Sequence, residues 1–262
     1  MALTGKSPSG TYKDLLTIEN SNNGVDGTLR SVNTGNGSST STSVSDRALK
    51  VKSATDNTTA LDIQNSSGST KFVVDTTNSQ VKALGNHVNT QYAYFGISSG
   101  ISANFTNNTH YAMPFATNGN TPTLQDDFNF GTSGEPATSF TTADATATDA
   151  SLIVPVMWYV PDNIHIDAVY SLEGLTTSNA NTTRMHLFSY TFTSGSTSCL
   201  TSGTVIAANS NVSNAGSEQA YLSTWAVNSA SVAAGKVILA FFRMDTVADD
   251  PSVAITVKYH LT

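Results

Sequence analysis

Two groups of side chains in this sequence have types and spacing that can support chemistry. His165 and Asp167 stand two residues apart, so on a strand they share the face opposite Ile164 and Ile166. Such a pair can ligate a metal, or act as a general base with the carboxylate that orients it. The commoner alternative is a polar strand face without a catalytic role.

The second group consists of two aspartate pairs, Asp126-Asp127 and Asp249-Asp250. Each pair can bind a hard cation such as Ca²⁺ together with loop carbonyls, or can be a solvated turn. A nucleophile-elbow pattern, GxSxG, occurs at residues 96–100 (GISSG), but an elbow needs a helix directly after it, and residues 101–108 (ISANFTNN) are poor helix formers. Acidic residues are too sparse to favour the paired carboxylates of glycan hydrolases. We therefore predict no enzyme activity, no resident metal and no cofactor.

The two tryptophans suggest different roles. Trp158 has Val156 and Val160 at two-residue spacing, which predicts a core position on a strand. Trp225 lies in residues 222–226 (LSTWA) beside polar side chains, so its ring can stack on a sugar or fill a core. Trp225 is the one candidate ligand-binding residue.

The elements that must position these residues are strands. Thr (38), Ser (34), Asn (23) and Gly (18) together make up 43% of the 262 residues, and charged residues only 12%. Short polar side chains suit strands and turns and disfavour helix interiors. Because 39% of residues are apolar and many lie in alternating runs, disorder is not expected over most of the chain. The sequence predicts an all-β protein.

Charge and hydropathy exclude several partners. The net charge is −7, and binding to nucleic acid through its phosphates needs a basic face. The longest apolar stretch, residues 152–161, is too short to cross a bilayer of about 30 Å and contains Pro155. The single cysteine, Cys199, excludes an internal disulfide framework. We predict neither nucleic-acid binding nor membrane insertion.

The chain divides into two modules of different composition. Residues 1–90 carry a net charge of +1 and residues 91–262 a net charge of −8; six of the seven prolines occur from Pro114 onward. The first module begins with an apolar cluster too short to make its own core, which we predict to anchor the chain to another protein. Residues 33–45 (NTGNGSSTSTSVS) are predicted to be an extended loop or linker. The anchoring residues are Tyr12, Leu15, Leu16 and Ile18.

Residues 48–85 contain four short segments in which apolar and polar residues alternate, separated by polar turns. Period-two alternation places the apolar residues of each segment on one face. A single narrow sheet of this kind is marginally stable and exposes its edges, whereas three copies around an axis bury the apolar faces against one another. We predict a homotrimeric β shaft; the alternative is a sheet packed on the C-terminal domain. The predicted trimer core comprises Leu49, Val51, Leu61, Ile63, Phe72, Val74 and Val81.

The second module has seven candidate strands with alternating apolar residues and turn chemistry between them. Seven or eight strands over about 150 residues are typical of an antiparallel, jelly-roll-like β-sandwich. The candidates are residues 151–160, 164–172, 184–192, 203–208, 219–227, 235–244 and 253–261.

Three stretches of the chain resemble a known family. Residues 10–16 (GTYKDLL) and 20–32 (NSNNGVDGTLRSV) look like the N-terminal segment of fibre-like virion proteins of tailed bacteriophages. Residues 72–81 (FVVDTTNSQV) are similar to the F-x-V-D-turn-x-V repeat of phage fibre shafts, with Asn78 where a turn glycine is common. Residues 185–188 through 257–261 resemble the β-sandwich head of the same class.

The resemblance implies a homotrimeric, non-enzymatic structural protein exposed on the virion surface, held by its N-terminus to a capsid or tail protein and used for host attachment. Alternatives are a lectin-like module that binds a host cell-surface glycan, or a fibre with glycan-hydrolase activity. The predicted division is an anchoring segment and linker over residues 1–45, a shaft over 46–90, a neck over 91–110 and a head over 111–262.

Overall fold

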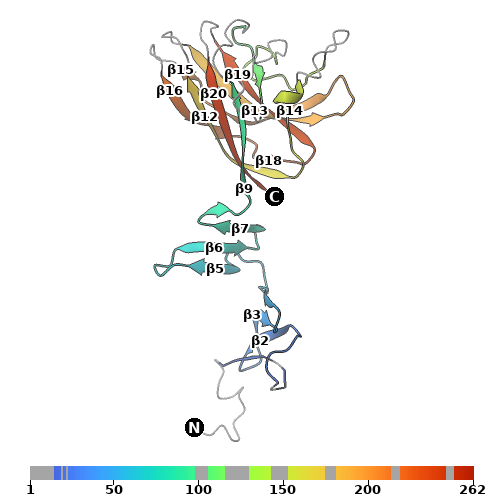
Figure 1. Cartoon of the computed structure of the whole chain (residues 1–262), viewed down its shortest axis with the longest axis vertical. Coiled ribbons are helices and arrows are strands. Elements are labelled where there is room, and N and C mark those ends of the chain that lie inside the picture. The colour runs from blue at the N-terminus through green and yellow to red at the C-terminus, as the bar shows by residue number, and fades with distance from the viewer. Residues whose placement is uncertain are drawn as a thin grey trace. The chain divides into compact units, whose positions relative to one another are not determined.

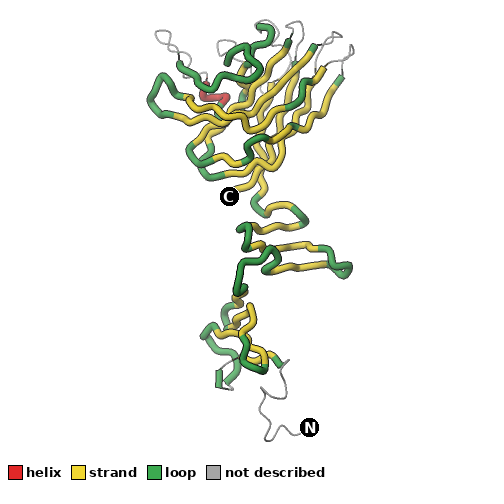
Figure 2. Tube along the Cα trace, turned by 180° about the vertical axis from the view of Figure 1, so that it is seen from behind, coloured by secondary structure: helices red, strands yellow, loops and turns green. Residues whose placement is uncertain are grey.

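The computed structural model describes residues 15–18, 20–21, 23–97, 106–115, 130–142, 153–174, 181–213, 219–245 and 251–262. The protein is all-β, as predicted: strands in four antiparallel sheets make up almost all of its regular structure (Figures 1 and 2). Among the described residues, no helix has the length and apolar character needed to span a membrane. The chain divides into an N-terminal unit, residues 1–88, and a C-terminal unit, residues 89–262.

The N-terminal unit contains two four-stranded sheets, each a meander of neighbouring strands. The first, which we call the N-terminal sheet, consists of β1 (Leu16–Ile18), β2 (Arg30–Thr34), β3 (Ser39–Val44) and β4 (Leu49–Val51). The second, the ladder sheet, consists of β5 (Leu61–Gln64), β6 (Thr70–Asp75), β7 (Gln80–Ala83) and β8 (Asn86–His87).

The C-terminal unit is built from two larger sheets, visible as two layers of strands in Figure 1. The five-stranded sheet has the order β16-β12-β20-β9, with β18 also paired to β12. Its strands are β9 (Thr90–Ile97), β12 (Ile164–Gly174), β16 (Ala220–Thr224), β18 (Ser231–Val232) and β20 (Ser252–Leu261).

The seven-stranded sheet has the order β10-β19-β13-β14-β17, with β11 paired to β19 and β15 to β13. Its strands are β10 (Tyr111–Met113), β11 (Trp158–Tyr159), β13 (Thr182–Phe192), β14 (Leu200–Ala208), β15 (Val212–Ser213), β17 (Ala226–Val227) and β19 (Lys236–Met244).

Alternation along β13 divides the apolar core of this unit into two layers. Met185 and Leu187 belong to the cluster that joins the two sheets, which also contains Phe95 and Ile255 of the five-stranded sheet. Phe188 and Tyr190 point to the opposite face and join a second cluster of mostly aromatic and aliphatic side chains. The predicted β-sandwich is therefore confirmed, and it has an additional apolar layer on the outer face of its seven-stranded sheet.

The predicted domain boundaries differ from these units in two places. The N-terminal sheet runs across the boundary predicted at residue 45, since β4 pairs with β3. β9 falls in the predicted neck, but it pairs with β20 over its whole length and is an edge strand of the sandwich.

The strand predicted over residues 151–160 is largely wrong. Residues 151 and 152 lie outside the described part, and Val154–Val156 form a single 3-10 turn, leaving only Trp158 and Tyr159 as a strand. Pro155 has no N–H to donate to a sheet, and the Met157 N–H instead bonds the Val154 carbonyl at 3.2 Å. Trp158 itself is buried, as predicted, and its ring stacks on that of Phe115.

A close backbone approach at Gly203 gives a first testable prediction. A Cβ on Gly203 would lie 2.5 Å from the Tyr190 ring and 2.9 Å from the Cα of Thr138. Gly203→Ala should therefore lower the free energy of unfolding by about 1–3 kcal/mol, measured by chemical denaturation. Gly134→Ala is the matched control, because nothing lies within 4 Å of its added Cβ. Equal stability of the two variants would contradict the packing described for Tyr190.

Candidate functional site

The candidate functional surface of the N-terminal unit is the apolar face of the ladder sheet. Strand pairing places Leu61 opposite Val74, and Val74 opposite Val81. The next row runs from Ile63 through Phe72 to Ala83 in the same way. Directly opposite residues on antiparallel strands point to the same side of a sheet. Three of the four predicted segments therefore do share one apolar face, with the predicted alternation.

This face is uncovered within the N-terminal unit. Leu61 is 39% exposed and Ile63 is 53% exposed, while Phe72, Val74 and Val81 are half-buried. None of the described residues between 15 and 88 is buried, and both apolar cores lie wholly within residues 93–257. Because a one-layer sheet must cover its apolar face to be stable, this surface has the character of an unfinished core.

The remaining predicted trimer-core residues, Leu49 and Val51, lie elsewhere. Both are on β4, which pairs with the polar strand β3 in the N-terminal sheet, so they do not extend the rows of the ladder sheet. The prediction of four equivalent segments was wrong because it took spacing alone as evidence of pairing. Leu49 and Val51 are nevertheless exposed, like the apolar residues of β5.

The turn between β6 and β7 is ordered by Asp75. Its carboxylate accepts hydrogen bonds from the Asn78 N–H at 2.9 Å and from the Asn78 side-chain amide at 2.7 Å. These bonds hold the pKa of Asp75 below its ordinary value. The left-handed residue of this turn is Ser79, with φ of 55°, and Asn78 instead serves as the side-chain partner of Asp75.

The predicted anchoring residues are only partly described. Tyr12 lies outside the described residues. Leu15 and Leu16 are exposed, Leu16 by 64%, and Ile18 is half-buried on β1. β1 pairs with β2, placing Ile18 opposite Val32. The start of the chain thus presents apolar side chains at the edge of a small sheet.

The linker predicted over residues 33–45 is instead part of a hairpin formed by β2 and β3. Its Thr and Ser side chains supply bonds that a flexible linker would lack; Thr40 Oγ1 donates to the Val32 carbonyl at 2.7 Å. Thr is also a good strand residue. A polar, Gly-containing composition suggested a linker, but it did not show where β-pairing starts.

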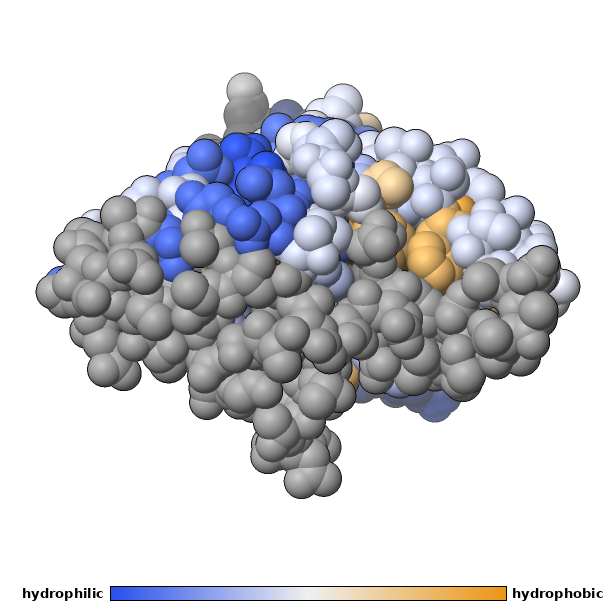
Figure 3. Space-filling model, turned by 90° about the horizontal axis from the view of Figure 1, so that it is seen from above, coloured by the Kyte–Doolittle hydropathy of each residue, from blue (hydrophilic) through white to orange (hydrophobic). Residues whose placement is uncertain are grey.

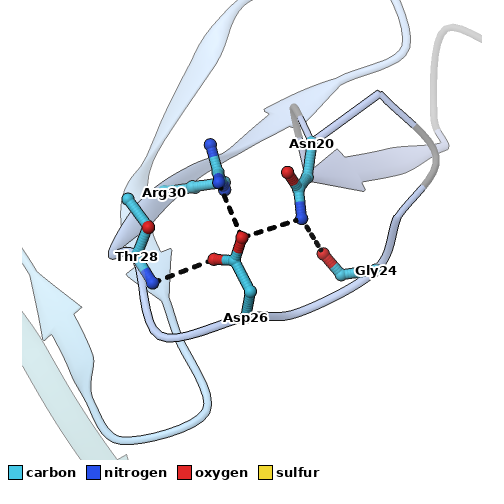
Figure 4. A network of polar contacts seen from close by, with 5 residues as sticks. All are labelled: Asn20, Gly24, Asp26, Thr28 and Arg30. Carbon is cyan, nitrogen blue, oxygen red and sulfur yellow. Dashed lines mark hydrogen bonds and ion pairs between the residues drawn. The ribbon is translucent and has the colours of Figure 1, made fainter.

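The loop before β2 is organised around Asp26 (Figure 4). One carboxylate oxygen accepts from Arg30 Nη2 at 2.8 Å and Asn20 Nδ2 at 3.3 Å, and the other accepts from the Thr28 N–H at 2.9 Å. Asn20 also donates to the Gly24 carbonyl. The Arg30 bond, followed by that of Thr28, lowers the pKa of Asp26.

Asp26→Ala should loosen this loop without unfolding the sheet. The Thr28 N–H loses its acceptor, so we expect its hydrogen exchange to accelerate. Asp46→Ala is the control, because that side chain makes only a 3.5 Å contact with the exposed Arg47. Unchanged exchange at Thr28 in Asp26→Ala would contradict this role.

The bonds of Asp26 also predict a pH dependence. Because the folded-state pKa of Asp26 is lowered, its stabilising effect is present at neutral pH and is lost as pH falls through that pKa.

His165 and Asp167, which the sequence left as either a catalytic or metal-binding pair or a polar strand face, do not contact each other as a pair; Asp167 contacts another histidine. Asp167 sits at a register shift in β12, and its carboxylate contacts His260 Nδ1 at 2.9 Å. His165 lies opposite His260 on β20, with ring centroids 5.2 Å apart, and its Nδ1 is 3.5 Å from Ser231 Oγ. The histidine near the serine is thus not the one that contacts the aspartate, so these residues do not form a nucleophilic triad. Sequence reasoning missed His260, which β-pairing brings from the end of the chain.

Of the two roles that the sequence left open for Trp225, the structure shows the core position and not a ring available to a ligand. Its side chain is only 4% exposed, and its indole N–H donates to Ser171 Oγ at 2.9 Å. A ring inside the sandwich cannot stack on a sugar. The polar neighbours that suggested an exposed ring include Ser223, which instead contacts a buried carboxyl, that of Glu173.

Glu173 is the centre of a buried network between the two sheets. Its carboxyl accepts from Thr183 Oγ1 at 2.7 Å, Ser223 Oγ at 3.1 Å and Ser171 Oγ at 3.3 Å. Burial raises its pKa above the ordinary value, although the hydroxyl bonds partly offset this. Because Thr183 is on β13 and Ser223 on β16, the network ties the seven-stranded sheet to the five-stranded one.

The other sequence motifs do not form a described site. Asp126-Asp127, Asp249-Asp250 and residues 98–100 of the GxSxG match lie outside the described residues. Cys199 is buried and in the reduced form, and burial raises the pKa of its thiol.

Comparison with known proteins adds no relative to this picture. No protein-family model and no curated protein matches the chain. A function for it must therefore be argued from its own residues.

Proposed function

We propose that the chain is a non-enzymatic structural protein of a bacteriophage virion, a homotrimeric fibre or spike. Residues near the N-terminus attach it to a capsid or tail protein, the ladder sheet forms the trimeric shaft, and the C-terminal unit is the head displayed for host attachment.

One observation carries this proposal: the N-terminal unit has aligned apolar rows but no buried residue among those described. Fully burying an aliphatic side chain stabilises the folded state by about 1.5–3 kcal/mol, and an exposed apolar face does not gain this stabilisation. Further copies of the same chain are the simplest way to cover the apolar face, because each copy supplies an identical face. In a closed ring of copies, no apolar face remains exposed. Trimeric closure gives a shaft built from thin sheets, as the resemblance to phage fibres implies.

The two ends of the chain support the division of roles. Leu16 on β1 and Leu15 just before it are exposed, and their sheet is too small for a core, which suits a segment that docks on another protein. The C-terminal unit has two buried apolar layers of its own, which suits a stable domain for display.

A reconstruction of the phage particle whose genome encodes this chain tests the proposal. We expect the chain in purified particles, with residues 1–45 docked on a capsid or tail protein and threefold density for the shaft. Absence of the chain from purified particles would contradict the proposed function.

A further inference from the structure

One end of the seven-stranded sheet contains a small polar cavity of about 190 Å³. Figure 3 shows a strongly hydrophilic area on the described surface of the molecule, separated by residues of intermediate hydropathy from a smaller hydrophobic area. The cavity has room for a few water molecules, at about 30 Å³ each, or for one polyatomic anion. Its lining is wholly polar: Asn108, Thr182, Arg184, Asn211, Arg243 and Asp245.

Two arginines face each other in this cavity. Arg184 on β13 lies directly opposite Arg243 on β19, and both are half-buried. Like charges directly opposite on neighbouring strands destabilise a sheet. Residues 91–262 contain only four basic side chains against twelve acidic ones, so placing two of the four in one cavity needs a specific reason.

Neither arginine is neutralised by the part of the protein that the structure describes. No carboxylate there lies within ion-pair distance of Arg184 or Arg243, although Asp245 lines the same cavity. One Asp245 oxygen accepts from the Thr182 N–H at 2.7 Å, which holds that carboxylate on the backbone.

The guanidinium groups are nevertheless held in place. Arg243 donates from Nε to the Asn108 carbonyl at 3.0 Å and from Nη2 to Asn108 Oδ1 at 2.7 Å. Arg184 donates from Nε to His186 Nε2 at 3.3 Å. Each guanidinium has five N–H donors, so both keep donors for a ligand. Oriented arginine donors suit the oxygens of carboxylate, phosphate and sulfate groups.

The neighbouring histidines add no charge near neutral pH. His110 and His186 have ring centroids 5.1 Å apart, and His186 accepts the Arg184 bond. Burial is the main reason why the pKa of His110 is lowered to about 4 and that of His186 to about 3, and the charges of Arg184 and Arg243 contribute to both decreases. The positive charge of the cavity therefore comes from its two arginines.

We propose that this cavity binds one anionic group of a small ligand, a carboxylate, phosphate or sulfate, between Arg184 and Arg243. The ligand's charge offsets the repulsion between the two arginines, and its oxygens accept their free N–H groups. The acidic surroundings favour a single anionic group over a polyanion such as nucleic acid. A role of this cavity in contacting the host rests on the proposed function. Anion binding by the chain itself does not depend on that function and can be tested without a virion.

The test is calorimetric titration of the full chain with sodium sulfate, sodium phosphate and sodium glucuronate at constant ionic strength, with glucose as the uncharged control. We expect one site per chain of millimolar affinity for at least one anion, and none for glucose. Arg184→Gln should weaken that binding at least tenfold. Arg47→Gln is the matched control, since this side chain is 83% exposed and lies outside the cavity; it should bind as the wild type does.

Wild-type melting provides a second measurement that does not depend on a variant. Sulfate and phosphate also stabilise proteins generally, because they are excluded from protein surfaces, and that effect grows in proportion to their concentration. A bound anion should instead raise the melting temperature at millimolar concentrations, and the rise should level off as the site fills. No saturable binding of any of the three anions, or equal binding by wild type and Arg184→Gln, would overturn the inference. Light scattering of the same samples keeps the two proposals separate: a trimer without anion binding refutes only the cavity, and an anion-binding monomer refutes only the fibre.

Discussion

Val74→Asp should convert the proposed trimer to a monomer at micromolar concentration. Val74 lies in the middle of the apolar face of the ladder sheet, between Leu61 and Val81. In a closed trimer the substitution would place three carboxylates in the shared core, and each buried unpaired charge costs several kcal/mol. Since about 1.4 kcal/mol is a tenfold change in an association constant, the trimer would be lost. Sedimentation velocity measures the result directly.

The neighbouring residue provides the matched control for this variant. Val73 is also a valine on β6, but it points to the opposite face, between Asp62 and Lys82. Val73→Asp makes the same chemical change on the polar side of the same strand. We expect it to remain trimeric. Loss of the trimer in both variants, or in neither, would show that the apolar face is not the interface.

Removing the buried carboxyl of Glu173 should destabilise the C-terminal unit strongly. Glu173→Ala leaves the hydroxyls of Thr183, Ser223 and Ser171 without their shared acceptor. A buried hydroxyl without a partner costs about 1–3 kcal/mol, so we expect a loss of about 3 kcal/mol or more. Both tryptophans of the chain, Trp158 and Trp225, are buried in this unit, so their fluorescence reports its unfolding in urea. A loss below about 1 kcal/mol would contradict the network.

Glu173 also predicts a pH dependence of stability. Because its folded-state pKa is raised above the ordinary value of 4.5, the folded state holds the proton more tightly than the unfolded state. Its contribution is fully present below the unfolded pKa and is lost as pH rises from there through the folded pKa. Glu173→Gln keeps the shape of the side chain without titrating. The stability of the wild type relative to Glu173→Gln should therefore fall over this range, and a constant difference would contradict the raised pKa.

Local periodicity was enough to predict three strands of the ladder sheet, β5 to β7, and their shared apolar face, but not the short strand β8. Ile63 follows Asp62 and Phe72 follows Lys71, for example, and β-pairing places Ile63 opposite Phe72. The same rule failed at Val154, where a proline interrupts the pattern and the chain makes a 3-10 turn. It also wrongly placed Leu49 in the ladder sheet: Leu49 lies opposite Val44, the one apolar residue of β3, whose other residues are Ser and Thr.

The candidate sites depend on contacts that the sequence does not encode locally. Arg184 and Arg243 are 59 positions apart, and only the register of β13 on β19 makes them neighbours. The one feature of the sequence that could have pointed to this site is that Arg184 and Arg243 are two of only four basic residues in residues 91–262. Trp225 had polar sequence neighbours, but burial is decided by the second sheet, which covers its ring.

The mass of the unmodified chain in solution tests the central claim most directly. Light scattering during size-exclusion chromatography should give about 82 kDa, three times the chain mass of 27.4 kDa. The apolar face of β5 to β7 would then be protected from solvent in hydrogen exchange. A single species of 27.4 kDa that keeps those strands folded and protected would contradict the account, because the ladder sheet would then need no sister copies.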